Sequence, residues 1–184
     1  GERRMRGHKA YVLAEVGGLV CSGLWDGSIR VWSMSGEATS ERMLAFGGGN
    51  GAVSSMSAWD GRLIIGHSNG KLRVLNMVTS ACDQVLEAHT GSVNALAVCG
   101  TRLVSGGCNG SIKVWGMLAA GACTCERTLV GHTDWVHSLA AWRSKVLSGS
   151  RDCSIRVWDV GTGAHDATVL VTGSVEGSAL QRIV

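Results

Sequence analysis

A pattern of about 40 to 45 residues recurs along this chain, and it limits the possible folds more than any other feature. Its clearest copy opens with Gly131-His132 and closes with Trp158-Asp159. Aligned near the end of each copy, the equivalent residues lie 43, 40 and 43 positions apart. These residues are Trp32, Leu75, Trp115 and Trp158. Such a period predicts one supersecondary unit that is stacked several times.

Each unit consists of short apolar runs separated by turn residues. Asp-Gly or Asn-Gly stands between apolar runs at Asp26-Gly27, Asp60-Gly61, Asn69-Gly70 and Asn109-Gly110. Both residues of these pairs tolerate positive φ, so the pairs are strong hairpin signals. The chain has 27 glycines and no proline, which suits many short paired strands. We therefore expect an all-β chain in which each unit is one four-stranded blade of a propeller.

Four complete units are predicted, at about 7–46, 47–87, 88–130 and 131–170. Residues 171–175 match residues 89–93, so a further unit begins at 171–184. Residues 2–6 stand where the outer strand of a preceding blade belongs. We therefore expect four blades with a single flanking strand at each end, within one propeller region over residues 1–184.

The end motifs and the period together resemble the WD40 repeat family. The matching segments run from Gly7-His8 to Trp32, from Ala88-His89 to Trp115, and from Gly131-His132 to Trp158-Asp159. Propellers of that family usually have seven blades, which need roughly 290 residues, and this chain has 184. The resemblance therefore implies either part of a larger propeller or two chains that complete each other, and we favour a fragment of a larger propeller, because an open arc of four blades would expose apolar blade faces.

A set of four polar and aromatic residues recurs in the units. It comprises His8, Ser22, Asp26 and Trp32, then His89, Ser105, Asn109 and Trp115, then His132, Ser148, Asp152 and Trp158. Ser, His and Asp also form hydrolase triads, but an enzyme needs one site and this set is repeated. The resemblance implies a structural hydrogen-bond network within each blade. The second unit has Ile65, Asn69 and Leu75 instead, so we expect apolar packing alone to hold it.

Other candidate chemical sites have simpler interpretations. Cys123 and Cys125 with His132 lack an evident fourth zinc ligand. The glycine-rich segment 47–51 lacks the Lys-Ser/Thr of a phosphate loop. The seven cysteines contain no CxxC pair, so we interpret them as small hydrophobic residues in a reducing compartment. We expect no metal and no cofactor.

A second group of residues falls in the loops at one end of the predicted propeller. This group comprises Lys9, Tyr11, Trp25, Asp134, Trp135 and Arg151. Aromatic residues and arginine are typical of binding hot spots, so we expect a partner-binding rim. The alternative is that Tyr11 and Trp135, at equivalent places in their units, only pack against the start of an inner strand.

These features favour a non-catalytic scaffold that binds a protein or peptide. The short first hairpins resemble WD40 repeats of myosin heavy-chain kinases and of F-box ubiquitin ligases, which implies a substrate-recruiting module. Family members that dock onto cullin-ligase adaptors often carry arginine two residues after Trp-Asp. Ser35, Leu118 and Gly161 stand at those places here, which disfavours that route. An RNA or ribonucleoprotein assembly subunit is the alternative, although a net charge of +3 makes nucleic acid unlikely. With no apolar run long enough to span a membrane, we expect a cytoplasmic or nuclear protein.

Overall fold

The structure is a computed structural model that describes residues 10–33, 41–46, 51–117 and 122–170. Within these ranges the chain forms sixteen strands and no helix. The strands make four separate sheets of four strands each. The prediction of an all-β chain with four four-stranded blades is therefore confirmed. The predicted flanking strands at 2–6 and 171–184 lie outside the described residues.

Every sheet is an antiparallel meander, and we call the sheets the first to fourth blade in chain order. The first blade contains β1 (Ala10–Val16), β2 (Leu19–Leu24), β3 (Ile29–Ser33) and β4 (Glu41–Leu44). The second contains β5 (Val53–Trp59), β6 (Arg62–His67), β7 (Lys71–Asn76) and β8 (Cys82–Glu87). The third contains β9 (Val93–Cys99), β10 (Arg102–Gly107), β11 (Ile112–Met117) and β12 (Cys123–Leu129). The fourth contains β13 (Val136–Trp142), β14 (Lys145–Ser150), β15 (Ser154–Asp159) and β16 (His165–Leu170).

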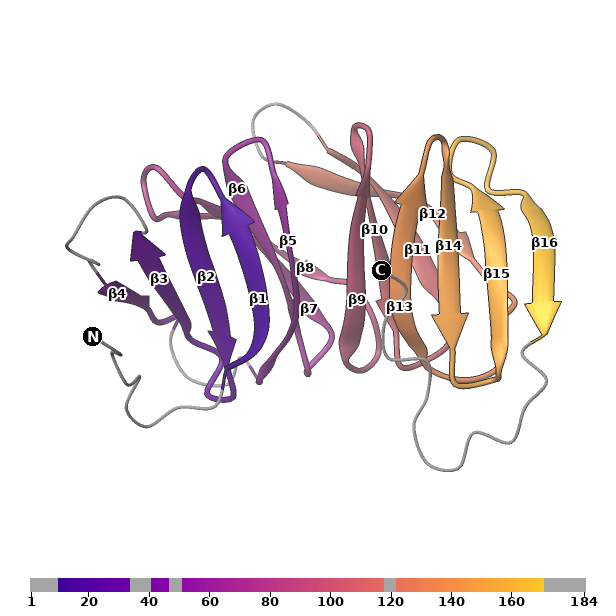
Figure 1. Cartoon of the computed structure of the whole chain (residues 1–184), viewed down its shortest axis with the longest axis horizontal. Coiled ribbons are helices and arrows are strands. Elements are labelled where there is room, and N and C mark those ends of the chain that lie inside the picture. Colours follow the sequence, from indigo (N-terminus) through magenta and orange to yellow (C-terminus); the bar gives the residue numbers. More distant parts are fainter. Residues whose placement is uncertain (1–9, 34–40, 47–50, 118–121, 171–184) are drawn as a thin grey trace, which may run out of the picture.

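The blades follow one another in an arc (Figure 1). The inner strands are the first strand of each blade, and each packs against the next: β1 against β5, β5 against β9, and β9 against β13. The outer strands β4 and β16 lie at the two ends of the arc. Because the strands alternate in direction, the loops before the inner strands and the turns between second and third strands share one end of every blade. We call this end the rim.

The hydrophobic core lies between neighbouring sheets and is divided into three parts. The first part joins Val16, Ile29 and Val31 of the first blade to Leu63 and Leu75 of the second. The second and third parts join the second blade to the third and the third to the fourth in the same way. Each interface is made by one face of one blade and the opposite face of the next, which is how stacked repeats bury a continuous core.

The second blade is not held by apolar packing alone. Ile65 and Leu75 are fully buried, as their sequence predicts. The second strand, however, also carries His67, whose ring is fully buried and whose Nδ1 donates to the carbonyl oxygen of Gly51 at 3.3 Å. This bond links the loop before β5 to the sheet. In the third and fourth blades a histidine in the loop bonds to a serine on the second strand. In the second blade a histidine on the second strand bonds instead to a backbone carbonyl of the loop.

The glycine of the β6–β7 turn links the second blade to the third. The carbonyl oxygen of Gly70 accepts hydrogen bonds from the amides of Ala88 and His89, each at 3.0 Å. Gly70 has a φ of +86°, and a Cβ atom there would collide with the His89 carbonyl oxygen. By contrast, Gly61 in the β5–β6 turn has a φ of +69° with open space around it.

These two glycines make a matched test of that contact. Gly61→Ala is expected to cost about 1 kcal/mol of unfolding free energy, because an L-residue is strained at positive φ. Gly70→Ala adds a backbone collision and is expected to cost about 3 kcal/mol or more. Denaturant unfolding of both variants measures the difference, and equal losses would contradict the contact.

Candidate functional site

In the fourth blade the predicted quartet forms one continuous hydrogen-bonded chain. The indole Nε1 of Trp158 lies 2.8 Å from the Ser148 hydroxyl, which lies 2.7 Å from His132 Nε2. On the other side of the ring, His132 Nδ1 lies 2.8 Å from Asp152 Oδ2. All four side chains are almost entirely removed from solvent.

The donor and acceptor roles in this chain follow from what each group is able to do. The indole N–H only donates, so the Ser148 hydroxyl accepts from Trp158 and donates to His132 Nε2. The Asp152 carboxylate only accepts, so His132 Nδ1 carries the hydrogen. Asp152 also accepts from the amides of Thr133 and Ser154, at 3.0 and 2.9 Å. The aspartate thus ties the loop before β13 to the β14–β15 turn.

Burial sets the charge of the histidine and hydrogen bonding sets that of the aspartate. Desolvation lowers the pKa of His132, although the bond to Asp152 opposes this shift. Desolvation alone would raise the pKa of Asp152, but hydrogen bonds from Ser154, His132 and Thr133 outweigh it and lower the pKa to about 2. At neutral pH a neutral imidazole therefore donates to a carboxylate, and the pair is a hydrogen bond instead of an ion pair.

The third blade keeps most of this hydrogen-bonded network, but Asn109 replaces the aspartate at its end. Trp115 Nε1 donates to the Ser105 hydroxyl at 2.9 Å, and His89 Nε2 lies 2.8 Å from the same oxygen. His89 Nδ1 meets the Ser111 hydroxyl at 3.2 Å, and that hydroxyl donates to Asn109 at 2.9 Å. Desolvation and the nearby Lys113 lower the pKa of His89 to about 4.

Part of the quartet is also present in the first blade. Trp32 Nε1 donates to the Ser22 hydroxyl at 3.3 Å, and Asp26 accepts from the Ser28 amide at 2.9 Å. In the fourth blade the Ser154 amide donates to Asp152 in the same way. His8 lies outside the described residues.

The structure places the predicted rim residues in two separate clusters, one on the fourth blade and one on the first. On the fourth blade the Arg151 guanidinium lies over the Trp135 ring at 5.5 Å, and Arg151 Nε is 3.8 Å from Asp134 Oδ2. On the first blade the rings of Tyr11 and Trp25 lie 5.6 Å apart. Trp25, at the tip of the β2–β3 turn, is 71% exposed. Lys9 lies outside the described residues.

The predicted equivalence of Tyr11 and Trp135 is wrong. Tyr11 and His137 each lie opposite a register shift, between Ala10 and Val12 in the first blade and between Val136 and Ser138 in the fourth. Tyr11 is therefore a strand residue at the place of His137, whereas Trp135 precedes its strand. Counting from the histidine misaligned the units because His8 is two residues nearer to its strand than His132 is.

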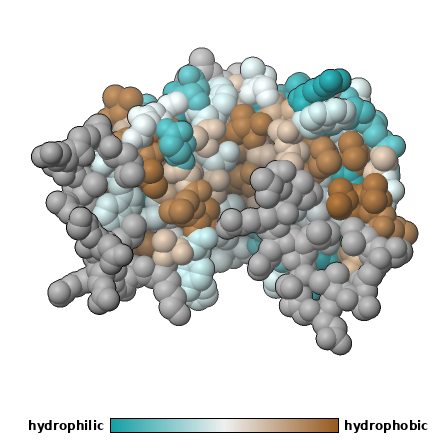
Figure 2. All heavy atoms as spheres, in the orientation of Figure 1, coloured by the Kyte–Doolittle hydropathy of each residue, from teal (hydrophilic) through white to brown (hydrophobic). Residues whose placement is uncertain are grey.

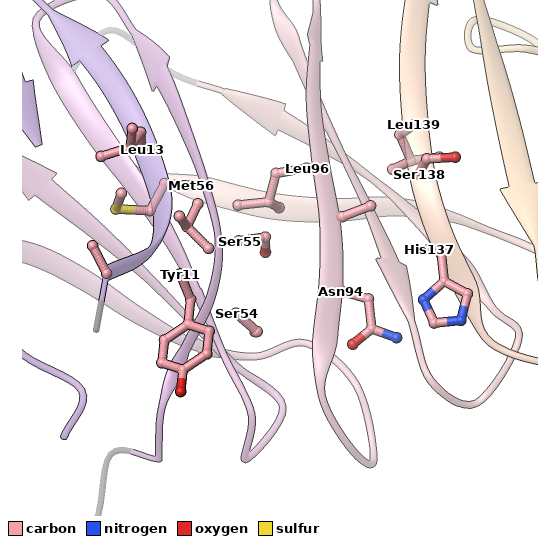
Figure 3. A pocket seen from close by; sticks show the side chains of 13 residues that line it. Tyr11, Leu13, Ser54, Ser55, Met56, Asn94, Leu96, His137, Ser138 and Leu139 are labelled. Atoms are coloured by element: carbon pink, nitrogen blue, oxygen red, sulfur yellow. The ribbon is translucent and has the colours of Figure 1, made fainter. Parts of the chain in front are cut away.

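The four inner strands line a shared groove of about 640 Å³ (Figure 3). Its rim end carries Tyr11, Ser54, Asn94 and His137, one from each inner strand at the same register position. Leu13, Met56, Leu96 and Leu139 follow two residues deeper. Sequence reasoning found Tyr11 but missed the other three polar residues. Counting back eleven positions from Ser22, Ile65, Ser105 and Ser148 would have found them.

The remaining sequence candidates form no chemical centre in the described part of the chain. Cys123 is buried while Cys125 is exposed on β12, and burial raises the pKa of the Cys123 thiol. Among the described residues, no group of three His, Cys, Asp or Glu side chains converges on a point that would hold a metal ion. Nor does that part of the chain form a helix long and apolar enough to cross a membrane.

The geometry defines the class of the protein as a β-propeller, because radially stacked four-stranded meanders with inner strands around a common groove are found in that class. The WD40 family, described as "WD domain, G-beta repeat", matches residues 2–33, 80–116 and 123–159. These matches cover more than half of the chain, so the protein belongs to the WD40 repeat family. Strands β5 to β7, which lack the quartet, fall between the matched ranges.

Solved structures agree with this assignment, whereas no curated protein matches the sequence. The computationally designed Ika4 protein is 28% identical with a TM-score of 0.73, over 88% of this chain and 99% of Ika4. The designed Ika8 protein is 30% identical with a TM-score of 0.74, over 87% of this chain and 49% of Ika8. A chain of the mitotic checkpoint complex is 20% identical with a TM-score of 0.80, over 92% of this chain and 53% of that one. This chain thus spans all of Ika4 but about half of the other two.

Replacing Ser148 tests the quartet. Ser148→Ala leaves the Trp158 indole N–H without an acceptor and His132 Nε2 without a donor, both buried. The expected cost is about 2–4 kcal/mol of unfolding free energy. Ser144→Ala in the exposed β13–β14 turn is the matched control and should change stability by less than about 0.5 kcal/mol. Similar losses in the two variants would show that the network does not stabilise the blade.

Acid is expected to destabilise the fold through its buried histidines. The folded-state pKa of His89 lies near 4, below its ordinary value of 6.5, so the unfolded chain binds the extra proton first. The stability that the neutral His89 contributes to the folded state is fully present above pH 6.5 and is lost as the pH falls towards 4. Unfolding free energy should drop by on the order of 1–2 kcal/mol between pH 7 and pH 5 from this residue alone. His89→Gln should flatten that slope, whereas the exposed His165→Gln should not.

Proposed function

We propose that this WD40 chain is a non-catalytic scaffold that binds a protein or peptide at its rim and in the adjoining groove. The observation that carries the proposal is the placement of exposed aromatic and arginine side chains around the groove mouth. Tyr11, Trp25 and Trp135 are all exposed, and Arg151 lies over Trp135. Side chains of these types dominate binding energy at protein interfaces.

The buried quartet supports a non-catalytic role. A serine nucleophile needs an oxygen that reaches the substrate, and its histidine must be free to accept the proton. The Ser148 hydroxyl is fully buried, and the Trp158 indole donates to it. The same arrangement occurs at Ser105 in the third blade. Repetition and burial both suit a structural role.

The groove supplies a place for an extended ligand. Its rim end is polar, with a hydroxyl, an amide and an imidazole from Ser54, Asn94 and His137, while leucine and methionine side chains line the deeper part. Pockets of this mixed character fix orientation through a few polar groups and gain affinity from apolar contact. A peptide with a polar end and an apolar side chain fits this chemistry.

The narrower role, substrate recruitment for a kinase or a ubiquitin ligase in the cytoplasm or nucleus, is the form of this function that the repeat resemblance favours. Assembly with RNA remains the alternative. The salt dependence of binding separates the protein-recruiting role from the RNA role, because RNA binding would weaken steeply with added salt. A net charge of +3 favours the protein partner.

The rim is tested by binding to a displayed library of random peptides. The double variant Trp25→Ala with Arg151→Glu should reduce binding of the selected peptides at least about tenfold, since each side chain is a hot-spot type. Val78→Ser is the matched control, because Val78 is exposed in the β7–β8 turn at the opposite end. Unchanged binding by the double variant would contradict the rim.

The scaffold function is separated from hydrolysis by an activity assay. Wild type and Ser148→Ala should both leave chromogenic esters and peptides unhydrolysed above background. Turnover by wild type that is lost in a folded Ser148→Ala variant would favour an enzyme instead.

A further inference from the structure

The four polar side chains at the rim end of the groove share one kind of backbone position. Each belongs to the residue that is skipped where the register shifts between the first and second strands of its blade. These residues are Tyr11, Ser54, Asn94 and His137. A β-bulge of this kind inserts one residue into a strand and re-aims its side chain. The bulges thus direct one side chain of each blade toward the groove (Figure 3).

Asn94 has no hydrogen bond that explains its presence there. Other asparagines of the chain hold turns: the Asn76 side-chain oxygen accepts from the amides of Val78 and Thr79 at 2.9 and 3.1 Å. The side-chain amide nitrogen of Asn94, by contrast, is shielded from water and has no partner in the described part of the chain. An unpaired buried amide lowers stability, so the residue needs another reason to be there.

The neighbouring hydroxyl groups are already used by the fold. The Ser54 hydroxyl lies 2.7 Å from the Val93 carbonyl oxygen and 3.1 Å from that of Gly66. The Ser55 hydroxyl also lies 2.7 Å from the Val93 oxygen. A hydroxyl has one hydrogen to donate, so neither serine has one left for a ligand. On the two middle blades, Asn94 is therefore the polar groove residue with a donor to offer.

The lining of the groove favours a neutral ligand group. None of the described residues that line it is Asp, Glu, Lys or Arg, so a charged chain end or a phosphate would lose water there without gaining a counter-charge. Figure 2 shows hydrophobic residues in the middle of the face that carries the inner strands. A side-chain amide donates through its nitrogen and accepts through its oxygen. Its neutral complement is the peptide group of a polypeptide backbone.

The structure already contains one pairing of this kind. Gln84 Nε2 donates to the Cys123 carbonyl oxygen at 3.1 Å, and the Cys123 amide donates to Gln84 Oε1 at 2.5 Å. One side-chain amide thus pairs with both backbone groups of a single residue, between β8 of the second blade and β12 of the third. We call this two-bond pairing an amide clamp.

Small side chains leave the way to Asn94 open over the second and third blades. In three blades the backbone amide at the tip of the rim turn donates to a carbonyl oxygen of the loop before the inner strand, which makes these residue pairs equivalent. The pairs are Ser68 with Ala52, Cys108 with Ser92, and Arg151 with Trp135. The middle blades therefore have small side chains where the fourth has tryptophan and arginine. An extended chain can reach Asn94 beside that larger cluster.

We propose that Asn94 forms an amide clamp on the backbone of an extended peptide that enters the groove over the second and third blades. The Asn94 amide pairs with the N–H and the carbonyl of one internal residue of the peptide. Its side chain turns to do so, a change that is common on binding. Peptide side chains beside the clamped residue contact Met56 and Leu96, two residues deeper. The proposal rests on the function proposed above and names the part of the ligand that is recognised.

Two asparagines separate binding from stability. Asn94→Ala should weaken binding of the peptides that wild type selects from a displayed random library at least about tenfold, because both bonds of the clamp are lost. It should not lower the denaturant midpoint of the free chain, because the amide nitrogen has no partner to lose. Unchanged peptide binding by Asn94→Ala would overturn the proposal.

Asn76→Ala is the matched control, and it should show the opposite pattern. Its denaturant midpoint should fall, because the amides of Val78 and Thr79 lose their acceptor. Peptide binding by the folded variant should stay as in wild type, since Asn76 ends β7 away from the rim. A midpoint of Asn94→Ala as low as that of Asn76→Ala would indicate a structural asparagine and would also overturn the proposal.

A second test changes the peptide, so it does not depend on how a variant folds. Each backbone amide of one selected peptide is N-methylated in turn. One position should lose at least about tenfold in affinity for wild type, and the same methylation should cost little more on Asn94→Ala, because the two changes remove the same bond. Losses that simply add at every position would contradict the clamp.

The outcomes distinguish this inference from the function on which it rests. Peptides that lose affinity for the Trp25→Ala with Arg151→Glu double variant, but not for Asn94→Ala, would keep the rim and overturn the clamp. Peptides that bind only through a free terminus would overturn the clamp as well. Failure of wild type to select any peptide would overturn both.

Discussion

The structure depends on apolar contact between the faces of neighbouring sheets. The ladder hydrogen bonds between paired strands close each meander within its own sheet, whereas the three core clusters each join two blades. A four-stranded sheet alone has no second layer to bury its apolar side chains against. Each blade therefore supplies the layer that its neighbour lacks, and the order of blades along the chain becomes the order around the arc. This dependence also explains why the first and fourth blades, which each share one of the three core clusters, expose apolar side chains such as Leu13 and Trp142.

The polar quartet holds the loop that precedes the inner strand. Apolar packing fixes the sheets against one another, and the quartet adds hydrogen bonds that fix the loop before the inner strand. The chain from Trp158 through Ser148 and His132 to Asp152 runs from the third strand to that loop. It thereby sets the position of Asp134 and Trp135, which follow directly on the rim. The buried network and the exposed rim are thus two parts of one loop, and a partner would meet a surface whose geometry is set from beneath.

Much of this architecture was predictable because it is repeated. The period, the Asp-Gly and Asn-Gly turns and the alternating apolar runs predict the strands and their meander from local rules alone. The quartet members of the fourth blade were also found by spacing. The groove was harder to predict, because Ser54, Asn94 and His137 become neighbours only when the blades stack. Their shared register was hidden by a two-residue difference in the loop before the first blade. His67 was missed for a similar reason, since its partner is a backbone carbonyl that no side-chain pattern reveals.

The direction of hydrogen bonding in the quartet has a consequence for how such a repeat changes over evolutionary time. Every member donates to or accepts from the next, so the loss of one leaves a buried neighbour unpaired. Single substitutions along that path are costly, whereas wholesale replacement by apolar residues is tolerated. The second blade has Ile65 for the serine, Leu75 for the tryptophan and Asn69 for the aspartate. Strong epistasis of this kind predicts that related repeats carry the set nearly whole or hardly at all.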